Sequence, residues 1–201
     1  EDNDEAMART IGSAVSQLTP VLGDLRPDIL LLVADRYEML APASVALALR
    51  IPIAHIEGGD ILVTGKEILV GRSARTDEKG VSQLSDIVTK LGYVMREVFT
   101  PPKILHFKTD CSLLGPNEIL STKRLQASGC FDGYKVINVA DGEEAAANAI
   151  RVNDYVIMPA GYSKTKAILE DHGYKVKAIN NTECAKLDGG MSCLSLRLNL
   201  M

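Results

Sequence analysis

The sequence lacks the features that mark membrane-spanning, nucleic-acid-binding and secreted proteins. Its longest purely apolar run, residues 29–34, is far shorter than the about 20 residues that cross a bilayer as a helix. Acidic and basic residues are interspersed along the chain, the net charge is −4 and the pI is about 5.4. This charge distribution does not indicate binding to nucleic acid or to an anionic membrane. Residues 1–5 are acidic where a signal peptide is basic, and no initiator methionine precedes them. We therefore expect a cytoplasmic polypeptide that has been trimmed or artificially joined.

Cysteine and aromatic residues are also scarce. The four cysteines, Cys111, Cys130, Cys184 and Cys193, include no C-x-x-C pair, which argues against a zinc site or a disulfide framework, so we expect no metal. Reduced, buried thiols account for at least three of them. Of the 201 residues, 46% are hydrophobic and only 4% aromatic, which is enough for one core or for two small cores that share an interface.

Residues 1–58 have the pattern of a Rossmann-like segment, a helix followed by a βαβ unit. Apolar residues recur every three or four positions between residues 7 and 22, which predicts an amphipathic helix. Residues 29–34 are a continuous apolar strand of the type that is buried on both faces of a parallel sheet. A helix over 38–50 and a strand over 51–56 follow. We expect the two strands to pair in parallel through a right-handed crossover.

Residues 59–201 repeat one order of elements three times: hairpin, helix, strand. This order indicates modules arranged around an axis. The predicted elements are a hairpin over 61–70, a helix over 81–91 and a strand over 97–100; a hairpin over 104–121, a helix over 123–127 and a strand over 135–139; and a hairpin over 147–159, a helix over 163–172 and a strand over 175–179. In the second hairpin, alternation along the strand over 104–114 predicts that His106 and Lys108 share one face.

Three places in the sequence are candidates for chemistry. Cys193 follows Gly189-Gly190 at the start of a short apolar strand; its thiol is either a nucleophile favoured by a nearby base or cation, or a small buried hydrophobe. His106 is either a catalytic group or a structural hydrogen-bonding residue. Glu57 and Asp60 flank two glycines at the boundary between the Rossmann-like segment and the repeated modules. They either orient a cationic group or form a solvated turn.

Four segments together resemble the dimethylarginine dimethylaminohydrolase family of the pentein (guanidine-modifying) superfamily. They are EGGDILVTGKEILVGRSARTDEKG at 57–80, ILHFKTDCSLLGPN at 104–117, NDYVIMPAGY at 153–162 and LDGGMSCLSLRL at 187–198. The resemblance extends over residues 57–201, with the segments in the right order. It implies an α/β fold, a pentein-like α/β propeller of five modules, of which the three rounds of hairpin, helix and strand are a part.

The resemblance also implies a catalytic trio. Cys193 corresponds to the nucleophile, His106 to the general acid and base, and Glu57 to the acid that supports the histidine or the substrate guanidinium. The implied reaction hydrolyses dimethylarginine to citrulline and dimethylamine through a cysteine thiouronium, and it needs no cofactor.

Further residues are implied as contacts to the substrate. Arg75 matches an arginine that binds the α-carboxylate of the substrate, Leu187 matches a position whose backbone carbonyl contacts substrate, and Asp60 is grouped with them as substrate-binding. The implied partner is a small guanidine, a methylated arginine, and a homo-oligomer is left open.

Residues 5–60 resemble a different family, the UDP-N-acetylglucosamine 2-epimerases. The matching strings are RPDILLLVADRYEMLAPA at 26–43 and IPIAHIEGGD at 51–60, in which Asp35, Arg36 and Glu57 correspond to active-site residues. Ala34 departs from the usual glycine of that family, and its first strand, its phosphate-side loop and its second Rossmann domain have no counterpart here. Both resemblances share the string at 57–60, so we interpret the chain as a chimera joined at that point.

These observations favour one function and leave two others open. The first is a guanidine-directed C–N hydrolase with an intact trio and impaired substrate recognition, because the replaced part of that family supplies further acids for the guanidinium and a second arginine. The second is a fragment of a UDP-N-acetylglucosamine 2-epimerase. The third is a non-catalytic chimeric or designed scaffold.

Overall fold

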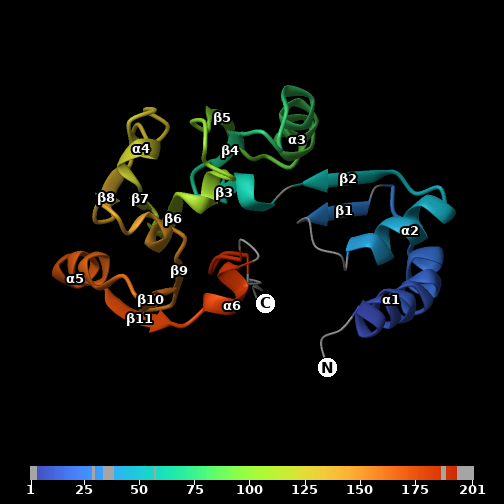
Figure 1. Ribbon diagram of the computed structural model, residues 1–201. Helices are drawn as coiled ribbons and strands as arrows, with labels where there is room; N and C mark the ends of the chain where they lie inside the picture. The colour runs from blue at the N-terminus through green and yellow to red at the C-terminus, as the bar shows by residue number, and fades with distance from the viewer. Residues whose placement is uncertain (1–3, 29, 34–38, 57, 187–188, 194–201) are drawn as a thin grey trace. The chain divides into compact units, whose positions relative to one another are not determined.

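The computed structural model describes residues 4–28, 30–33, 39–56, 58–186 and 189–193 (Figure 1). The chain divides into two compact units, Glu1–Gly58 and Gly59–Met201. Both mix helices with strands. No helix in the described ranges combines the length and the apolar character needed to cross a bilayer.

The first unit has the predicted order of helix, strand, helix, strand. Its elements are α1 (Asp4–Leu25), β1 (Leu30–Val33), α2 (Leu40–Ala48) and β2 (Ile53–Ile56). The strands pair in parallel, with Leu30 opposite Ile53, which confirms the predicted pairing. A small core of Leu22, Val45, Ala46 and Ile51 packs α1 against α2 and the start of the second strand.

The second unit contains three modules with the predicted order of hairpin, helix and strand, drawn in green, yellow and orange-red in Figure 1. In each sheet the second hairpin strand is central, antiparallel to the first and parallel to the strand after the helix. The modules are β3 (Ile61–Val63), β4 (Ile68–Arg72), α3 (Glu78–Lys90) and β5 (Met95–Phe99); β6 (Cys111–Gly115), β7 (Glu118–Ser121), α4 (Lys123–Gln126) and β8 (Lys135–Asn138); and β9 (Ile150–Val152), β10 (Tyr155–Pro159), α5 (Ser163–Asp171) and β11 (Lys175–Ile179). The connections contain η2 (Gly58–Asp60), η3 (Phe107–Thr109), η4 (Glu144–Ala147) and α6 (Thr182–Ala185).

The segment before β6 differs from the prediction. Residues 104–110 were expected to be strand, but they form a loop with the 3₁₀ turn η3, and the strand begins only at Cys111. The His106 N–H donates to the Thr109 hydroxyl (3.2 Å), and the Phe107 N–H donates to the Asp60 carboxylate (2.7 Å). Side chains therefore satisfy donors that a strand would have offered to a sheet. The prediction that His106 and Lys108 share a face of a strand is wrong.

The middle module is buried on both sides of its sheet. Neighbouring residues of β7 belong to different cores. Ile119 packs in a cluster with Leu69 from the first module and Phe107 from the loop before β6, and Leu120 packs in a cluster with Val156 from the third module. Ile119 and Leu120 are both fully buried. Because successive side chains of a strand point to opposite faces, one strand joins two hydrophobic cores.

Hydrogen bonds between modules follow the same repeat. Tyr134 and Tyr174 each stand directly before the last strand of a module and donate their hydroxyls to a glutamate of the preceding module, Glu67 and Glu118 respectively. Burial and the bond to Glu118 raise the pKa of Tyr174 to about 12. Lys135, bonded to Glu118, lowers the pKa of that carboxyl group.

Of these two glutamates, Glu67 accepts the larger number of hydrogen bonds. Arg96 donates to both of its carboxylate oxygens, at 3.0 and 2.8 Å, and Tyr134 donates to one of them at 3.1 Å. The bond from Arg96 lowers the pKa of Glu67, and burial opposes this in part. The ionised carboxylate therefore stabilises the folded state.

We expect Glu67→Gln to lower the free energy of unfolding by about 1.5–3 kcal/mol near neutral pH, the usual range for a hydrogen bond to a charged group. Because the folded-state pKa of Glu67 lies below its unfolded value, this stabilisation is complete above the unfolded pKa of about 4.3 and is lost as pH falls through the folded value. Urea unfolding at about pH 7 and about pH 3.5 measures this.

The matched control is Glu183→Gln, which removes an exposed ion pair with Lys186 and should cost at most about 1 kcal/mol. If the stability difference between Glu67→Gln and the wild type were the same at both pH values, the ionised pair would not be the stabilising species.

Candidate functional site

A cavity of about 230 Å³ lies within the second unit. The turn before β3, the loop before β6 and the segment 189–193 reach it, together with residues of η4 and of the segments around the start of α5 and around α6. Its lining consists of Gly59, Leu105, His106, Lys108, Thr109, Ala145, Asn148, Pro159, Tyr162, Asn181, Ala185, Gly189, Gly190, Ser192 and Cys193. Both His106 and Cys193 therefore line one cavity.

His106 is held close to the backbone of the turn before β3. A Cβ atom on Gly59 would lie 2.7 Å from Cγ of His106, so the imidazole occupies space that only glycine leaves free. Its Nδ1 is buried, has no hydrogen-bond partner among the described residues, and lies 3.7 Å from Oδ2 of Asp60. A protonated imidazole in this position faces a carboxylate.

Asp60 is the most fully bonded acid of the site. It is 1% exposed, and its carboxylate accepts from the hydroxyls of Ser73 and Thr76 and from the Phe107 N–H, each at 2.7 Å. Asp60 itself does not line the cavity. The carboxylate thus ties the segment after β4 to the residue that follows His106.

Cys193 lies in a turn at the end of the described chain, and its side chain is exposed. The preceding loop is anchored by the Gly189 N–H, which donates to the Cys184 carbonyl (2.9 Å), and by the Asn181 amide, which donates to the Gly189 carbonyl (3.2 Å). The short strand predicted after Cys193 lies outside the described residues.

The four thiols occupy different environments. Cys111 and Cys130 are buried, and burial raises the pKa of both thiols. Cys184 is partly exposed and Cys193 is exposed, so two thiols rather than the predicted three are fully buried. All four cysteines are free.

Several predicted site residues do not join this cavity. Arg75 is exposed in the segment after β4 and is not part of the cavity lining. Glu57, Leu187, Asp35 and Arg36 lie outside the described residues. The structure therefore brings His106 and Cys193 together at one cavity and places Asp60 beside His106.

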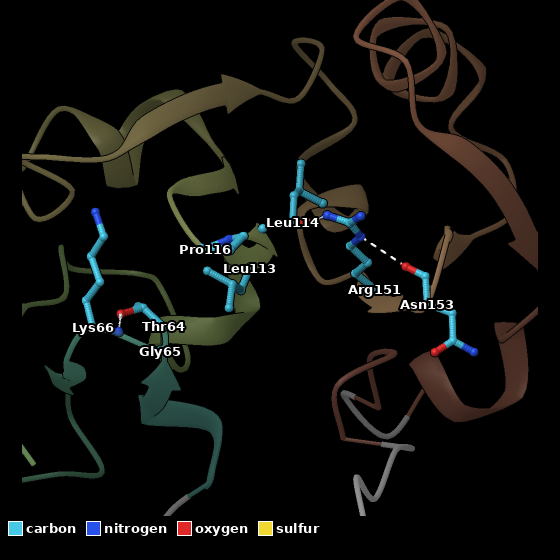
Figure 2. A pocket seen from close by; sticks show the side chains of 9 residues that line it. Thr64, Gly65, Lys66, Leu113, Leu114, Pro116, Arg151 and Asn153 are labelled. Atoms are coloured by element: carbon cyan, nitrogen blue, oxygen red, sulfur yellow. Dashed lines mark hydrogen bonds between the residues drawn. The ribbon is translucent and has the colours of Figure 1, made fainter. Parts of the chain in front are cut away.

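A larger, more open hollow of about 440 Å³ lies among the hairpin turns of the three modules (Figure 2). Two basic residues line it. Arg151 donates hydrogen bonds to the carbonyls of Asn153 and Leu114, and Lys66 donates one to the side chain of Asn117. None of the predicted site residues that the structure describes lines it. Across the described ranges, no three histidine, cysteine, aspartate or glutamate residues are grouped so as to hold one metal ion.

Comparison with known proteins identifies the family. A curated dimethylarginine dimethylaminohydrolase from Pseudomonas aeruginosa is 38% identical over 142 residues, which is 71% of this chain and 56% of the relative. A solved structure of the Pseudomonas aeruginosa enzyme, a cysteine-to-serine mutant complexed with citrulline, is 31% identical with a TM-score of 0.70, and the match covers 85% of this chain and 70% of that chain. The chain belongs to the dimethylarginine dimethylaminohydrolase family.

The first part of this chain matches the model of a second family. The model of UDP-N-acetylglucosamine 2-epimerase matches residues 1–63, and the model of arginine deiminase matches 44–101. A GDP/UDP-N,N'-diacetylbacillosamine 2-epimerase (hydrolyzing) from Campylobacter jejuni is 37% identical over 60 residues, 30% of this chain and 16% of the relative. The chain spans a little over half the length of the curated dimethylaminohydrolases it matches. Both predicted resemblances are confirmed.

Sequence reasoning missed several residues that line the cavity of this dimethylaminohydrolase-family site. Tyr162, Asn148 and Asn181 line it, but Asn148 stands within an alanine-rich stretch and the other two in loops. No periodicity or motif in one sequence distinguishes them from ordinary polar residues. Only the contacts of the folded chain show their place.

We expect Gly59→Ala to lower the free energy of unfolding by about 1–3 kcal/mol, the usual cost of overpacking, because the new methyl group must displace the His106 ring. Gly80→Ala in α3 is the matched control: its Cβ would meet only Oδ1 of Asp77, at 3.5 Å. That control should be neutral or stabilising by about 0.5–1 kcal/mol, since alanine favours a helix.

Urea unfolding compares the two variants, and the NMR shifts of the His106 ring show whether the imidazole has moved. Equal stability and unchanged ring shifts in Gly59→Ala would contradict the close packing of His106 on this turn.

Proposed function

We propose that this chain carries the cysteine–histidine machinery of a guanidine C–N hydrolase that acts on dimethylarginine. The main support is that Cys193 and His106 line one cavity in a member of the dimethylarginine dimethylaminohydrolase family. A second support is the Pseudomonas aeruginosa relative in complex with citrulline, which is the product of this reaction.

In the proposed mechanism, the Cys193 thiolate attacks the central carbon of the guanidinium. The tetrahedral adduct collapses with loss of dimethylamine, which takes a proton from His106, and leaves a covalent thiouronium on Cys193. His106 then removes a proton from water, the water oxygen adds to the same carbon, and the C–S bond breaks. The hydroxyl proton of this adduct passes to the released dimethylamine or to solvent, which leaves citrulline, the Cys193 thiolate and a protonated His106.

Asp60 acts in this proposal by holding His106 rather than by touching the substrate. Its oxygens already accept three hydrogen bonds, and Oδ2 lies 3.7 Å from Nδ1 of His106. When His106 is protonated, the buried carboxylate stabilises the imidazolium and orients the opposite ring nitrogen toward the cavity. A rigid carboxylate that orients a histidine base is a common feature of nucleophilic catalysis.

Substrate binding is the weaker part of the proposed enzyme. Glu57 is proposed to support the histidine or the guanidinium, Arg75 the α-carboxylate, and the Leu187 carbonyl a further substrate contact. In the dimethylaminohydrolase family, the part that is replaced here supplies further acids and a second arginine. We therefore propose that binding and alignment are impaired while the chemistry of the thiol is retained.

The match of residues 1–63 to the epimerase model supports a second candidate, a UDP-N-acetylglucosamine 2-epimerase fragment with Asp35, Arg36 and Glu57 in its site. Release of UDP from UDP-N-acetylglucosamine tests it. Release of neither UDP nor citrulline by a cooperatively folded chain would identify a non-catalytic scaffold.

Cys193 should be the most reactive thiol of the folded protein, because an imidazole and a cation-binding cavity favour a thiolate. Limited alkylation with chloroacetamidine, followed by mass spectrometry, should label Cys193 at least about tenfold faster than Cys184, in line with general base assistance. His106→Ala should slow labelling at Cys193 and leave Cys184 unchanged. Preferential labelling of Cys111, Cys130 or Cys184 would remove the main support for the hydrolase.

Turnover of dimethylarginine should be very low, because a misplacement of about 1 Å costs about a hundredfold in rate and several charged contacts are replaced. A citrulline assay with millimolar substrate measures it, with Cys193→Ser as the background. Robust, Cys193-dependent turnover would show that the first unit supplies new substrate contacts, and the proposed impairment would be wrong.

A further inference from the structure

Asn148 directly follows η4 and is fixed by the core around it. Its neighbours Ala146, Ala147 and Ala149 are buried in the cluster that joins the second and third modules. The Asn148 N–H donates to the Ala145 carbonyl at 3.3 Å, and the residue is only 8% exposed. The backbone that carries its side chain is therefore held in place by the core.

The carboxamide of Asn148 lies against the backbone that leads to Cys193. Its Oδ1 accepts a hydrogen bond from the Ser192 N–H at 2.9 Å. A Cβ atom on Gly190 would lie 2.2 Å from Nδ2 of Asn148, so the two groups are in direct contact. Asn148 thus holds the chain on both sides of Met191, and the bonded amide belongs to the residue immediately before Cys193.

The other anchors of the loop lie farther from the thiol along the chain. The Cys184 carbonyl and the Asn181 amide both bond to Gly189, four positions before Cys193. The bond from the Ser192 N–H to Asn148 instead holds the residue immediately before Cys193. A change at this bond therefore acts on the backbone that leads directly into Cys193.

We propose that Asn148 is a positioning residue for the nucleophile: its carboxamide oxygen fixes the Ser192 peptide and so aims the Cys193 thiol into the cavity that His106 lines. This inference rests on the proposed function. Attack on carbon needs the reacting atoms about 3–3.5 Å apart and aligned, so rotation of the preceding peptide lowers the rate even when the thiol stays accessible. Asn148 contacts neither the thiol nor the imidazole through any bond described here; it acts through Ser192.

Two nearly isosteric variants separate the acceptor from the bulk of the side chain. Asn148→Leu keeps the volume and removes the oxygen, and Asn148→Asp keeps an acceptor for the Ser192 N–H. Iodoacetamide is neutral, so the new carboxylate of the aspartate variant neither attracts nor repels the probe, and rates measured over a range of pH separate its effect on the Cys193 thiol from that of orientation. Asn138→Leu is the matched control, because its amide bonds to Gln126 and does not line the cavity.

The measurement is the alkylation rate of each cysteine in the full chain by mass spectrometry. We expect Asn148→Leu to slow Cys193 by about tenfold, Asn148→Asp to retain the rate to within about threefold, and Asn138→Leu to match the wild type. Cys111 and Cys130 should stay protected in all of them, because they are buried in the core.

Three results would overturn the inference: an unchanged Cys193 rate in Asn148→Leu, an equal loss in Asn148→Asp, or faster labelling of Cys111 and Cys130, which would make Asn148 a general packing residue. The proposed function would still stand after any of these. By contrast, wild-type Cys193 reacting no faster than Cys184 would reject the proposed function itself, and this inference with it.

Discussion

The second unit depends on the burial of sheet faces by neighbouring modules. A three-stranded sheet with one helix leaves apolar surface uncovered, and each module here covers that surface with the next module. The middle sheet shows the consequence most clearly, because Ile119 and Leu120 of β7 belong to two separate hydrophobic cores. Polar contacts follow the same geometry: Tyr134 and Tyr174 reach back to glutamates of the preceding modules. The three modules therefore share their hydrophobic cores within one compact unit.

The candidate site is built from the segments that connect these sheets. His106 precedes β6 and Cys193 ends the described chain after the third module, and neither belongs to a regular strand or helix. Loops carry function when a rigid scaffold holds them, and here two buried polar side chains provide the hold. Asp60 fixes the loop beside His106, and Asn148 fixes the loop before Cys193. Both anchors are more than nine-tenths buried, so their bonds face little competition from water.

In the proposed enzyme, the second unit carries Cys193 and His106, and the first unit replaces the part of the family that supplies further substrate contacts. The cavity, His106 and Cys193 lie in the unit that resembles the dimethylaminohydrolases. The first unit matches an epimerase model instead, and it consists of a parallel two-stranded sheet with helices. A nucleophile and a base can be held locally, but a substrate with charged groups at both ends needs contacts over a longer distance. For this reason, we expect thiol reactivity and turnover to differ in this protein.

The sequence by itself determined the order of the helices and strands, because the spacing of apolar residues indicates which face of each segment is buried. It predicted the parallel pairing of β1 and β2 and the three rounds of hairpin, helix and strand, and the resemblance selected His106 and Cys193. Tertiary structure decided what periodicity cannot record, the partner of each polar group. Residues 104–110 have the alternation of a strand. In the structure, however, the Phe107 N–H donates to Asp60, which lies 47 positions earlier in the sequence, and the segment forms a loop. Asn148 likewise accepts a hydrogen bond from Ser192, which lies 44 positions later in the sequence. A hydrogen bond between distant residues leaves no periodic trace in the sequence, so only the folded chain reveals it.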